Sequence, residues 1–235
     1  MTRFSTSIKC LTALFGLLLC MALPLKAQDD PPPIDLSRVP VNGASPEAFV
    51  PSGWKIEEKI VGDLDRDGVG DVVLDLIQDL PAETDDHPNN RSRALLVLLH
   101  GKDGAFHRKG AAAQLLCCTL CGGTLSDPSG AGGLVTIQKG VIVVSQMAGS
   151  REMTTTTHRF RQDPATGSFM LIGLDAVDND RLTGDWSSVS TNYITGVQIS
   201  ESHRTDRKGK DILRSKTTKQ VTKKQRALES AVCGE

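Results

Sequence analysis

The chain has 235 residues, with 27 Lys and Arg against 28 Asp and Glu, so its formal charge at pH 7 is −1. This length is enough for one substantial hydrophobic core or two small ones. The chain contains only two tryptophans and one tyrosine, which gives little support to a sugar-binding face built from several aromatic platforms.

The first 27 residues have the pattern of a secretory signal peptide. Arg3 and Lys9 give a positive start, residues 11–23 are almost wholly apolar, and Ala27 places a small residue before a plausible cleavage point. The apolar run is shorter than the about 20 residues that a membrane span needs. We therefore predict a signal peptide over residues 1–27.

Two further observations bear on the final location of the protein. Leu19, rather than a small residue, precedes Cys20, which favours a soluble exported protein over a lipid-anchored one. No later segment is long and apolar enough to be a transmembrane segment. The sequence thus predicts a periplasmic or secreted protein.

The exported part is expected to begin with a proline-rich leader over residues 28–48. Its run 29–33, Asp-Asp-Pro-Pro-Pro, cannot begin a regular element. A β domain follows over residues 49–200. Residues 54–61 alternate apolar and charged side chains, whereas residues 71–77 carry apolar side chains on both faces. These patterns predict two strands, the second covered on both sides.

The loop 63–71 between these strands has aspartates at its positions 1, 3, 5 and 9 and a glycine at position 6. Calcium takes about six to eight oxygen ligands, and alternate residues of a tight loop can point inward together. The alternative is an Asp- and Gly-rich hairpin turn, which does not need this alternation. We predict a Ca²⁺ site whose ligands are the carboxylates and one backbone carbonyl: Asp63, Asp65, Asp67, Asp71 and Val69.

After this loop, residues 94–99 predict a short buried strand, and Gly101–Gly104 predicts a hairpin turn. Residues 105–107 follow as the start of the next strand. The alanines and leucines of Ala111–Leu116 predict one short helix.

Four cysteines follow the leader: Cys117, Cys118, Cys121 and Cys233. In an oxidising compartment they allow two disulfides in three pairings, which the sequence leaves open. The Cys-x-x-Cys spacing is superficially that of a redox motif. At the C-terminus of the predicted helix, the helix dipole would oppose thiolate formation, so we interpret these cysteines as structural.

A second β series completes the domain, with turn residues at Lys139-Gly140 and at Asp163–Gly167. The expected strands are 134–138, 141–147, 152–162, 168–175 and 187–200. Residues 201–235 form a basic polar tail, with ten Lys and Arg against five Asp and Glu. The fold class predicted is mainly β: an antiparallel meander of about eight strands in two propeller-blade-like sheets, with one short helix.

The calcium loop and the segments after it resemble one FG-GAP repeat, the calcium-binding blade of integrin α-chain β-propellers. The residues that carry this resemblance are Gly62–Val73, Ala94–Leu99 and Gly101–Phe106. The resemblance implies the same calcium ligands. A wider resemblance, to exported bacterial proteins of uncharacterised function that have one such loop, implies no activity. It is carried by the loop together with Val50–Trp54, Phe160-Arg161, Phe169–Gly173 and Asn192–Gly196.

The sequence departs from the FG-GAP pattern in one respect, because repeat proteins need several neighbouring units and no second copy of the loop occurs. The nearest candidate lacks the alternation and the glycine, and we interpret it as a polar turn. It consists of Asp175, Asp178, Asp180 and Asp185.

No local catalytic motif is present: the sequence has no nucleophile elbow, His-Glu-x-x-His helix, phosphate-binding loop or dinucleotide fingerprint. The favoured hypothesis is an exported calcium-binding β domain with a non-catalytic binding or structural role at the cell envelope, and with an unidentified partner. The alternative is a calcium-assisted hydrolase of an envelope polymer, built from distant residues such as His158 and Asp175.

A third hypothesis is adhesion of the basic tail to nucleic acid or anionic lipid. A solvated, mobile tail is the simpler interpretation, and we expect no specific nucleic-acid binding.

Overall fold

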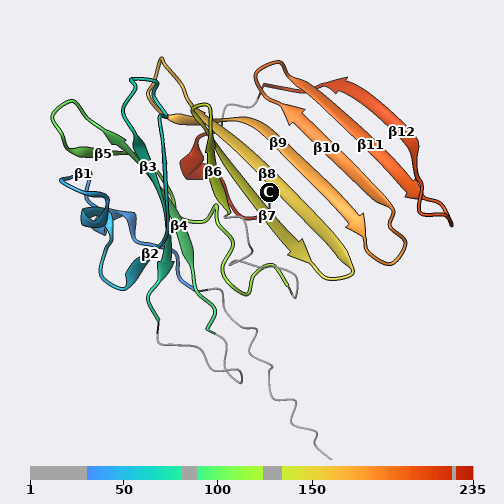
Figure 1. Ribbon diagram of the computed structural model, residues 1–235, viewed down its shortest axis with the longest axis horizontal. Helices are drawn as coiled ribbons and strands as arrows, with labels where there is room; N and C mark the ends of the chain where they lie inside the picture. The colour runs from blue at the N-terminus through green and yellow to red at the C-terminus, as the bar shows by residue number, and fades with distance from the viewer. Residues whose placement is uncertain (1–30, 81–88, 124–133, 224–225, 235) are drawn as a thin grey trace, which may run out of the picture.

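The computed structural model describes residues 31–80, 89–123, 134–223 and 226–234, and it is mainly β (Figure 1). Within these residues two antiparallel sheets, of five and seven strands, form the fold. The prediction of a mainly β, antiparallel, two-sheet fold is confirmed. The predicted signal peptide, residues 1–27, lies outside the described residues.

The first sheet has the strand order β1-β5-β4-β3-β2. Its strands are β1 (Asn42–Gly43), β2 (Trp54–Gly62), β3 (Asp71–Gln78), β4 (Arg93–His100) and β5 (Phe106–Ala112). The two central strands β3 and β4 are buried along all but their last residue. This burial on both faces explains the near-continuous apolar sequence of β3, as predicted.

The second sheet has the order β12-β11-β10-β9-β8-β7-β6. Its strands are β6 (Val135–Gln138), β7 (Val141–Gly149), β8 (Glu152–Gln162), β9 (Phe169–Asp180), β10 (Trp186–Asn192), β11 (Val197–Thr205) and β12 (Asp211–Gln220). Each strand pairs with the next one in sequence, so the whole sheet is a meander.

The main hydrophobic core lies between the two sheets. Val73, Leu95 and Val97 of the first sheet pack in one cluster with Ile142 and Phe160 of the second. All five side chains are fully buried. Side chains alternate between the two faces of a sheet along each strand. The first sheet is therefore apolar on both faces, whereas the β6–β9 part of the second sheet is apolar on one face.

The opposite face of the first sheet is covered by the N-terminal segment. Ile34, Val39 and Phe49 pack there against Leu74 and Leu96. This segment contains two short 3₁₀ helices, η1 (Leu36–Arg38) and η2 (Pro46–Phe49). The predicted leader 28–48 is therefore part of the folded structure from residue 31 on, because its scattered apolar residues complete a second core.

The C-terminal segment returns to the main core. A third 3₁₀ helix, η3 (Leu228–Ser230), places Leu228 and Ala231 in the core between the sheets. Two disulfides are present, Cys117–Cys233 and Cys118–Cys121. The first ties this segment to the chain after β5. The structural role predicted for the cysteines agrees with this arrangement.

The predicted helix Ala111–Leu116 is wrong. Ala111 and Ala112 end β5, where they lie opposite Leu96 and Leu95. Leu115 and Leu116 then enter the main core. Pairing with β4 overrides the local helix propensity of the alanines, and the small alanine side chains fit a strand that is buried at this end. The described residues contain only 3₁₀ helices, and none of these could cross a membrane.

The predicted long strand 187–200 is also wrong, because it is a hairpin of β10 and β11. Gly196 lies in the connecting turn with φ of 73°, a backbone conformation that favours glycine. The sheet then continues through β11 and β12 to Gln220. Part of the predicted basic tail 201–235 is thus an ordered β-hairpin, and the boundary expected at residue 200 falls inside β11.

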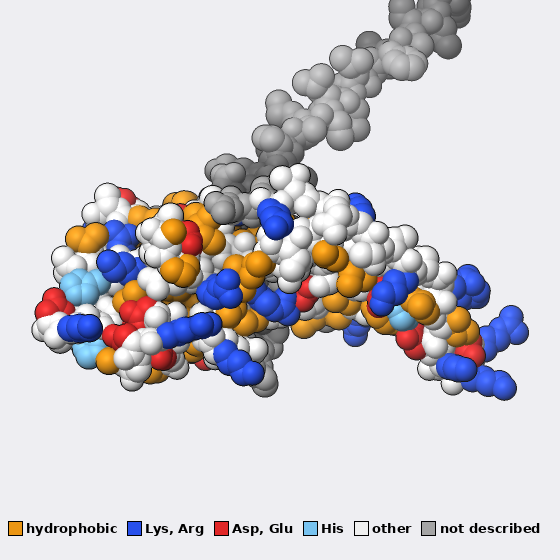
Figure 2. Space-filling view, turned by 90° about the horizontal axis from the view of Figure 1, so that it is seen from above, with side chains coloured by type: hydrophobic (Ala, Val, Ile, Leu, Met, Phe, Trp, Pro, Cys, Tyr) orange, Lys and Arg blue, Asp and Glu red, His pale blue; other side chains and the backbone are white. Residues whose placement is uncertain are grey.

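Strands β10, β11 and β12 extend away from the first sheet (Figure 1). None of their residues belongs to either hydrophobic cluster of the described chain. In Figure 2 this part of the sheet forms a narrow projection with exposed apolar and basic side chains. We call these three strands the flange.

Candidate metal centre

The acidic loop is the connection of the β2–β3 hairpin. Gly62 at the end of β2 lies opposite Asp71 at the start of β3. Between them, Leu64 is buried in the main core with only 2% of its surface exposed. Its backbone N–H donates a hydrogen bond of 2.7 Å to Asp71 Oδ2. The loop is therefore anchored in the core by an apolar side chain in its second position.

The aspartates shape the loop through hydrogen bonds with its backbone. Asp63 accepts from the N–H groups of Arg66 and Gly68, at 2.6 and 3.2 Å. Asp65 accepts from the N–H of Asp67 at 3.1 Å. Arg66 and Gly68 both have positive φ, of 68° and 87°. Glycine takes up this conformation without strain, which is why the loop has glycine at its sixth position.

Three carboxylates meet at the base of the loop. One oxygen each of Asp63, Asp65 and Asp71 lies within 4.8 Å of the other two. Such a group could hold a metal ion. Among the described residues it is the one group of three or more acidic, histidine or cysteine side chains with this geometry.

Asp71 is the most constrained member of this cluster because it is wholly buried. Burial raises the pKa of its carboxyl, and the negative charge of Asp65 acts in the same direction. The backbone N–H groups of His100 and Leu64 donate to its two oxygens and lower that pKa. The residues fit a cation in this respect, because a positive charge would offset the cost of burying an ionised carboxylate.

The other two predicted ligands are placed differently. Asp67 is not part of the cluster, and its Oδ1 accepts the N–H of Val69 at 2.8 Å. Val69 itself is 41% exposed. The cluster therefore contains three of the four predicted aspartates.

The turn between β6 and β7 lies against the acidic loop. Lys139 and Gly140 both have positive φ, and a side chain at Gly140 would lie 3.5 Å from the carbonyl oxygen of Asp63. A pocket of about 460 Å³ opens at this junction, with Arg66 and Lys139 among its lining residues. The loop of the first sheet thus contacts the second sheet directly.

The second acidic group considered in the sequence is dispersed over β9 and the turn after it. Asp175 pairs with Arg159 at 2.6 Å, and Asp178 accepts from the hydroxyl of Thr154. Asp180 pairs with Arg151. Asp185 accepts the backbone N–H of Thr205 at 3.0 Å. These contacts explain the four carboxylates without a cation.

The catalytic pair suggested by sequence is not assembled. His158 lies opposite Leu174 in the β8–β9 ladder, so the next residue, Asp175, points to the other face of the sheet. The His158 ring is 1% exposed and stacks on Phe160. Burial lowers its pKa to about 4, with a smaller contribution from Arg226. An imidazole with so low a pKa is a weak base, and its enclosure in the core separates it from water, so it is unsuited to activating water.

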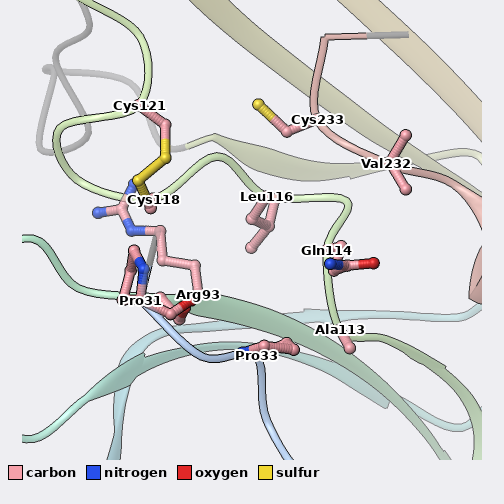
Figure 3. A pocket seen from close by; sticks show the side chains of 11 residues that line it. Pro31, Pro33, Arg93, Ala113, Gln114, Leu116, Cys118, Cys121, Val232 and Cys233 are labelled. Carbon is pink, nitrogen blue, oxygen red and sulfur yellow. A yellow bond between two sulfur atoms is a disulfide. The ribbon is translucent and has the colours of Figure 1, made fainter. Parts of the chain in front are cut away.

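A pocket of about 330 Å³ lies beside the Cys118–Cys121 disulfide (Figure 3). Arg93, the first residue of β4, and Ser92, the residue before it, line one side of the pocket. Gln114 and Cys233 line another side. Arg93 is buried and pairs with Glu57 at 2.5 Å. Its charge is thus already balanced, and the pocket shows no arrangement of nucleophile and base.

Two polar groupings were missed at the sequence level. Asp75 is buried near Arg93, in the middle of the apolar β3 strand. In the flange, Trp186 stacks on His203 with ring centroids 3.7 Å apart, and both bond to Asp211. The sequence alone could have indicated Asp75, because it is an aspartate inside an apolar strand. It could not have indicated the second grouping, which depends on the register between strands.

No family model matches this sequence, and searches of curated proteins and of solved structures found no match either. The resemblance to an FG-GAP repeat therefore stays a prediction.

Proposed function

We propose that this protein is an exported β domain that binds calcium and has a non-catalytic binding or structural role at the cell envelope. The observation that carries the proposal is the cluster of three carboxylates at the base of the β2–β3 loop. The two disulfides favour an oxidising compartment, which agrees with the signal peptide predicted from the sequence.

The donor set favours calcium over the transition metals. The cluster offers carboxylate oxygens and no histidine or cysteine, and hard oxygen donors suit calcium or magnesium. Calcium tolerates the irregular geometry of a flexible loop, whereas magnesium demands a near-ideal octahedron. In this proposal Asp63, Asp65 and Asp71 hold the ion, and Asp67 and the Val69 carbonyl are the predicted additional ligands.

Occupation of the site would act on stability. The three carboxylates repel one another when ionised, and the loop that carries them is anchored in the core through Leu64. A ligand that binds only the folded loop stabilises the fold by about 1.4 kcal/mol at ten times its dissociation constant. Extracellular modules bind calcium at about 10⁻⁴ to 10⁻³ M, so the site would be filled permanently outside cells.

The test is a calcium titration of the purified mature protein, followed by isothermal calorimetry and thermal unfolding. We expect calcium to raise the melting temperature of the wild type and chelator to reverse the rise. Asp65→Asn should abolish the shift, because it removes one charge from the cluster and keeps an acceptor for the Asp67 N–H.

Asp103→Asn is the matched control. Asp103 also lies in a hairpin turn and accepts a backbone N–H, but it is outside the cluster. This variant should keep the full calcium shift. An unchanged shift in Asp65→Asn, or a wild type that calcium does not stabilise, would reject the site.

A further inference from the structure

The outer edge of β12 is a long strand edge without a partner in the described chain. β12 is the last strand of the seven-stranded sheet and pairs only with β11. All ten of its residues are exposed. The other sheet ends differ, because β1 has two residues and the edge strands β2 and β6 contact each other.

The register shows which backbone groups point outward. The Val221 N–H donates to the Gly196 carbonyl at 2.8 Å, so these two residues form a hydrogen-bonded pair. Hydrogen-bonded and non-hydrogen-bonded pairs alternate in an antiparallel ladder. Thr218, which lies opposite Ile199, is therefore in a non-hydrogen-bonded pair. The N–H groups that point away from β11 are those of Lys216, Thr218 and Gln220.

The edge is also strongly basic. Residues 206–219 contain six basic and two acidic residues, a net charge of six minus two, or +4. Lys216 already pairs with Glu201 at 2.7 Å. Arg214 is the extra residue of a bulge. Within the described residues neither Arg214 nor Lys219 forms an ion pair with a carboxylate. Basic side chains that lack a partner thus stand beside unpaired backbone groups.

We propose that the outer edge of β12 is a docking site for an acidic peptide segment in extended conformation, which adds to the sheet as an eighth strand. The outward N–H and C=O groups would bind the peptide backbone, as in strand addition. Arg214 and Lys219 select acidic side chains by charge. This inference rests on the binding role proposed above and names the class of partner, an acidic peptide. The docking site uses no residue of the metal cluster.

A second copy of this chain is a poorer occupant than an acidic peptide. Pairing of two β12 edges would bring the two basic strands together, and like charges on adjacent strands are destabilising. Lysine on an edge strand is a common protection against self-association. The charge that opposes self-pairing favours an acidic strand.

The experiment measures binding of fluorescent ten-residue peptides to the whole mature protein by anisotropy. The probe alternates Glu and Thr, and a Lys and Thr peptide is the charge control. Thr218→Pro removes an outward N–H that the β11 ladder does not use, and proline is tolerated on edge strands. Thr218→Val keeps the N–H and is the matched control.

We expect the acidic peptide to bind the wild type and Thr218→Val alike, and the basic peptide not to bind. Thr218→Pro should weaken binding about tenfold, the loss expected for one or two hydrogen bonds. Lys219→Glu should weaken it about threefold and reduce its salt dependence. The Thr218 N–H should gain protection from hydrogen exchange on binding.

Three results would overturn the proposal. Equal affinity in Thr218→Pro would show attraction by charge alone. Binding of phosphatidylglycerol vesicles without binding of the peptide would assign the edge to a lipid surface. A dimer that Thr218→Pro dissociates would assign it to a second copy. Because calcium chelation should leave peptide binding intact, failure here and failure of the metal site are distinguishable.

Discussion

The carboxyl of Asp75 lies in the middle of β3 with 2% of its residue surface exposed. Its Oδ1 has no hydrogen-bond partner in the described structure. Burial raises its pKa to about 7; the charge of Arg93 opposes this rise, and Glu57 and Glu58 add to it. At the residue scale, Asp75 is the clearest case of a carboxyl whose ionisation is made unfavourable by folding.

The sign of its pH effect follows from proton linkage. The pKa of Asp75 is about 7 in the folded protein and 3.8 in the unfolded chain, so the folded state binds more protons between these values. Its contribution to stability is therefore complete below about pH 4 and is lost as the pH rises through about 7. Asp75→Asn should remove this loss and raise the free energy of unfolding at pH 8 by about 1 to 3 kcal/mol.

Urea unfolding of the wild type and Asp75→Asn from pH 4 to pH 8 measures this effect. The gain should grow with pH and be smallest at pH 4. Asp79→Asn, at an exposed aspartate that pairs with Lys55, is the control and should show no such trend. Parallel pH profiles for the wild type and Asp75→Asn would contradict the assignment.

At the scale of elements, the junction of β2 and β6 holds the two sheets together beside the acidic loop. An added Cβ at Gly62 would lie 2.7 Å from Cγ2 of Ile137, which is closer than real contacts allow. Glycine is needed here for the close approach of the strand to a side chain of the other sheet.

Gly62→Ala should therefore lower the free energy of unfolding by about 1 to 3 kcal/mol, the usual cost of overpacking. Ile137→Ala combined with Gly62→Ala should cost less than the sum of the two single changes, because the smaller side chain makes room. Denaturant unfolding of the three variants measures the coupling. Strict additivity would show that the steric contact does not limit the approach.

Some elements are readable in the sequence because their signal is local. The turn residues Lys139-Gly140 and Asp163–Gly167 mark hairpins, and β8 matches its prediction over Glu152–Gln162. The spacing of the aspartates also indicates three members of the carboxylate cluster, Asp63, Asp65 and Asp71, but it does not show that Asp67 lies outside it. Other elements depend on distant pairing. Ala111 and Ala112 are a strand because β4 lies beside them.

The flange shows a further limit of the sequence. The ten residues of β12 are all exposed, so no alternation of buried and exposed positions exists for the sequence to display. These residues form a strand because they pair with β11 and make side-chain contacts such as that of Lys216 with Glu201. The sequence of a strand with two solvated faces therefore resembles that of a polar tail, and only its pairing with a neighbouring strand distinguishes the two.

At the scale of the whole molecule, the two disulfides have unequal effects. Cys117–Cys233 joins residues 116 positions apart, whereas Cys118–Cys121 spans three. By restricting the unfolded chain, the first disulfide stabilises the fold by about 5 kcal/mol and the second by about 2 kcal/mol.

Replacing Cys117 and Cys233 by serine should therefore lower the melting temperature much more than replacing Cys118 and Cys121. Thermal unfolding of the two double variants provides the comparison, and each serves as the control for the other. Equal effects would show that the long bridge does not restrict the unfolded chain.

Leu228 fills a position between the two sheets that no earlier part of the described chain occupies. Closure of the two sheets around a complete interior therefore requires a side chain that follows both sheets in sequence. If the segment around η3 were displaced, a gap would remain between the sheets, so the docking of this segment is coupled to the packing of the whole core.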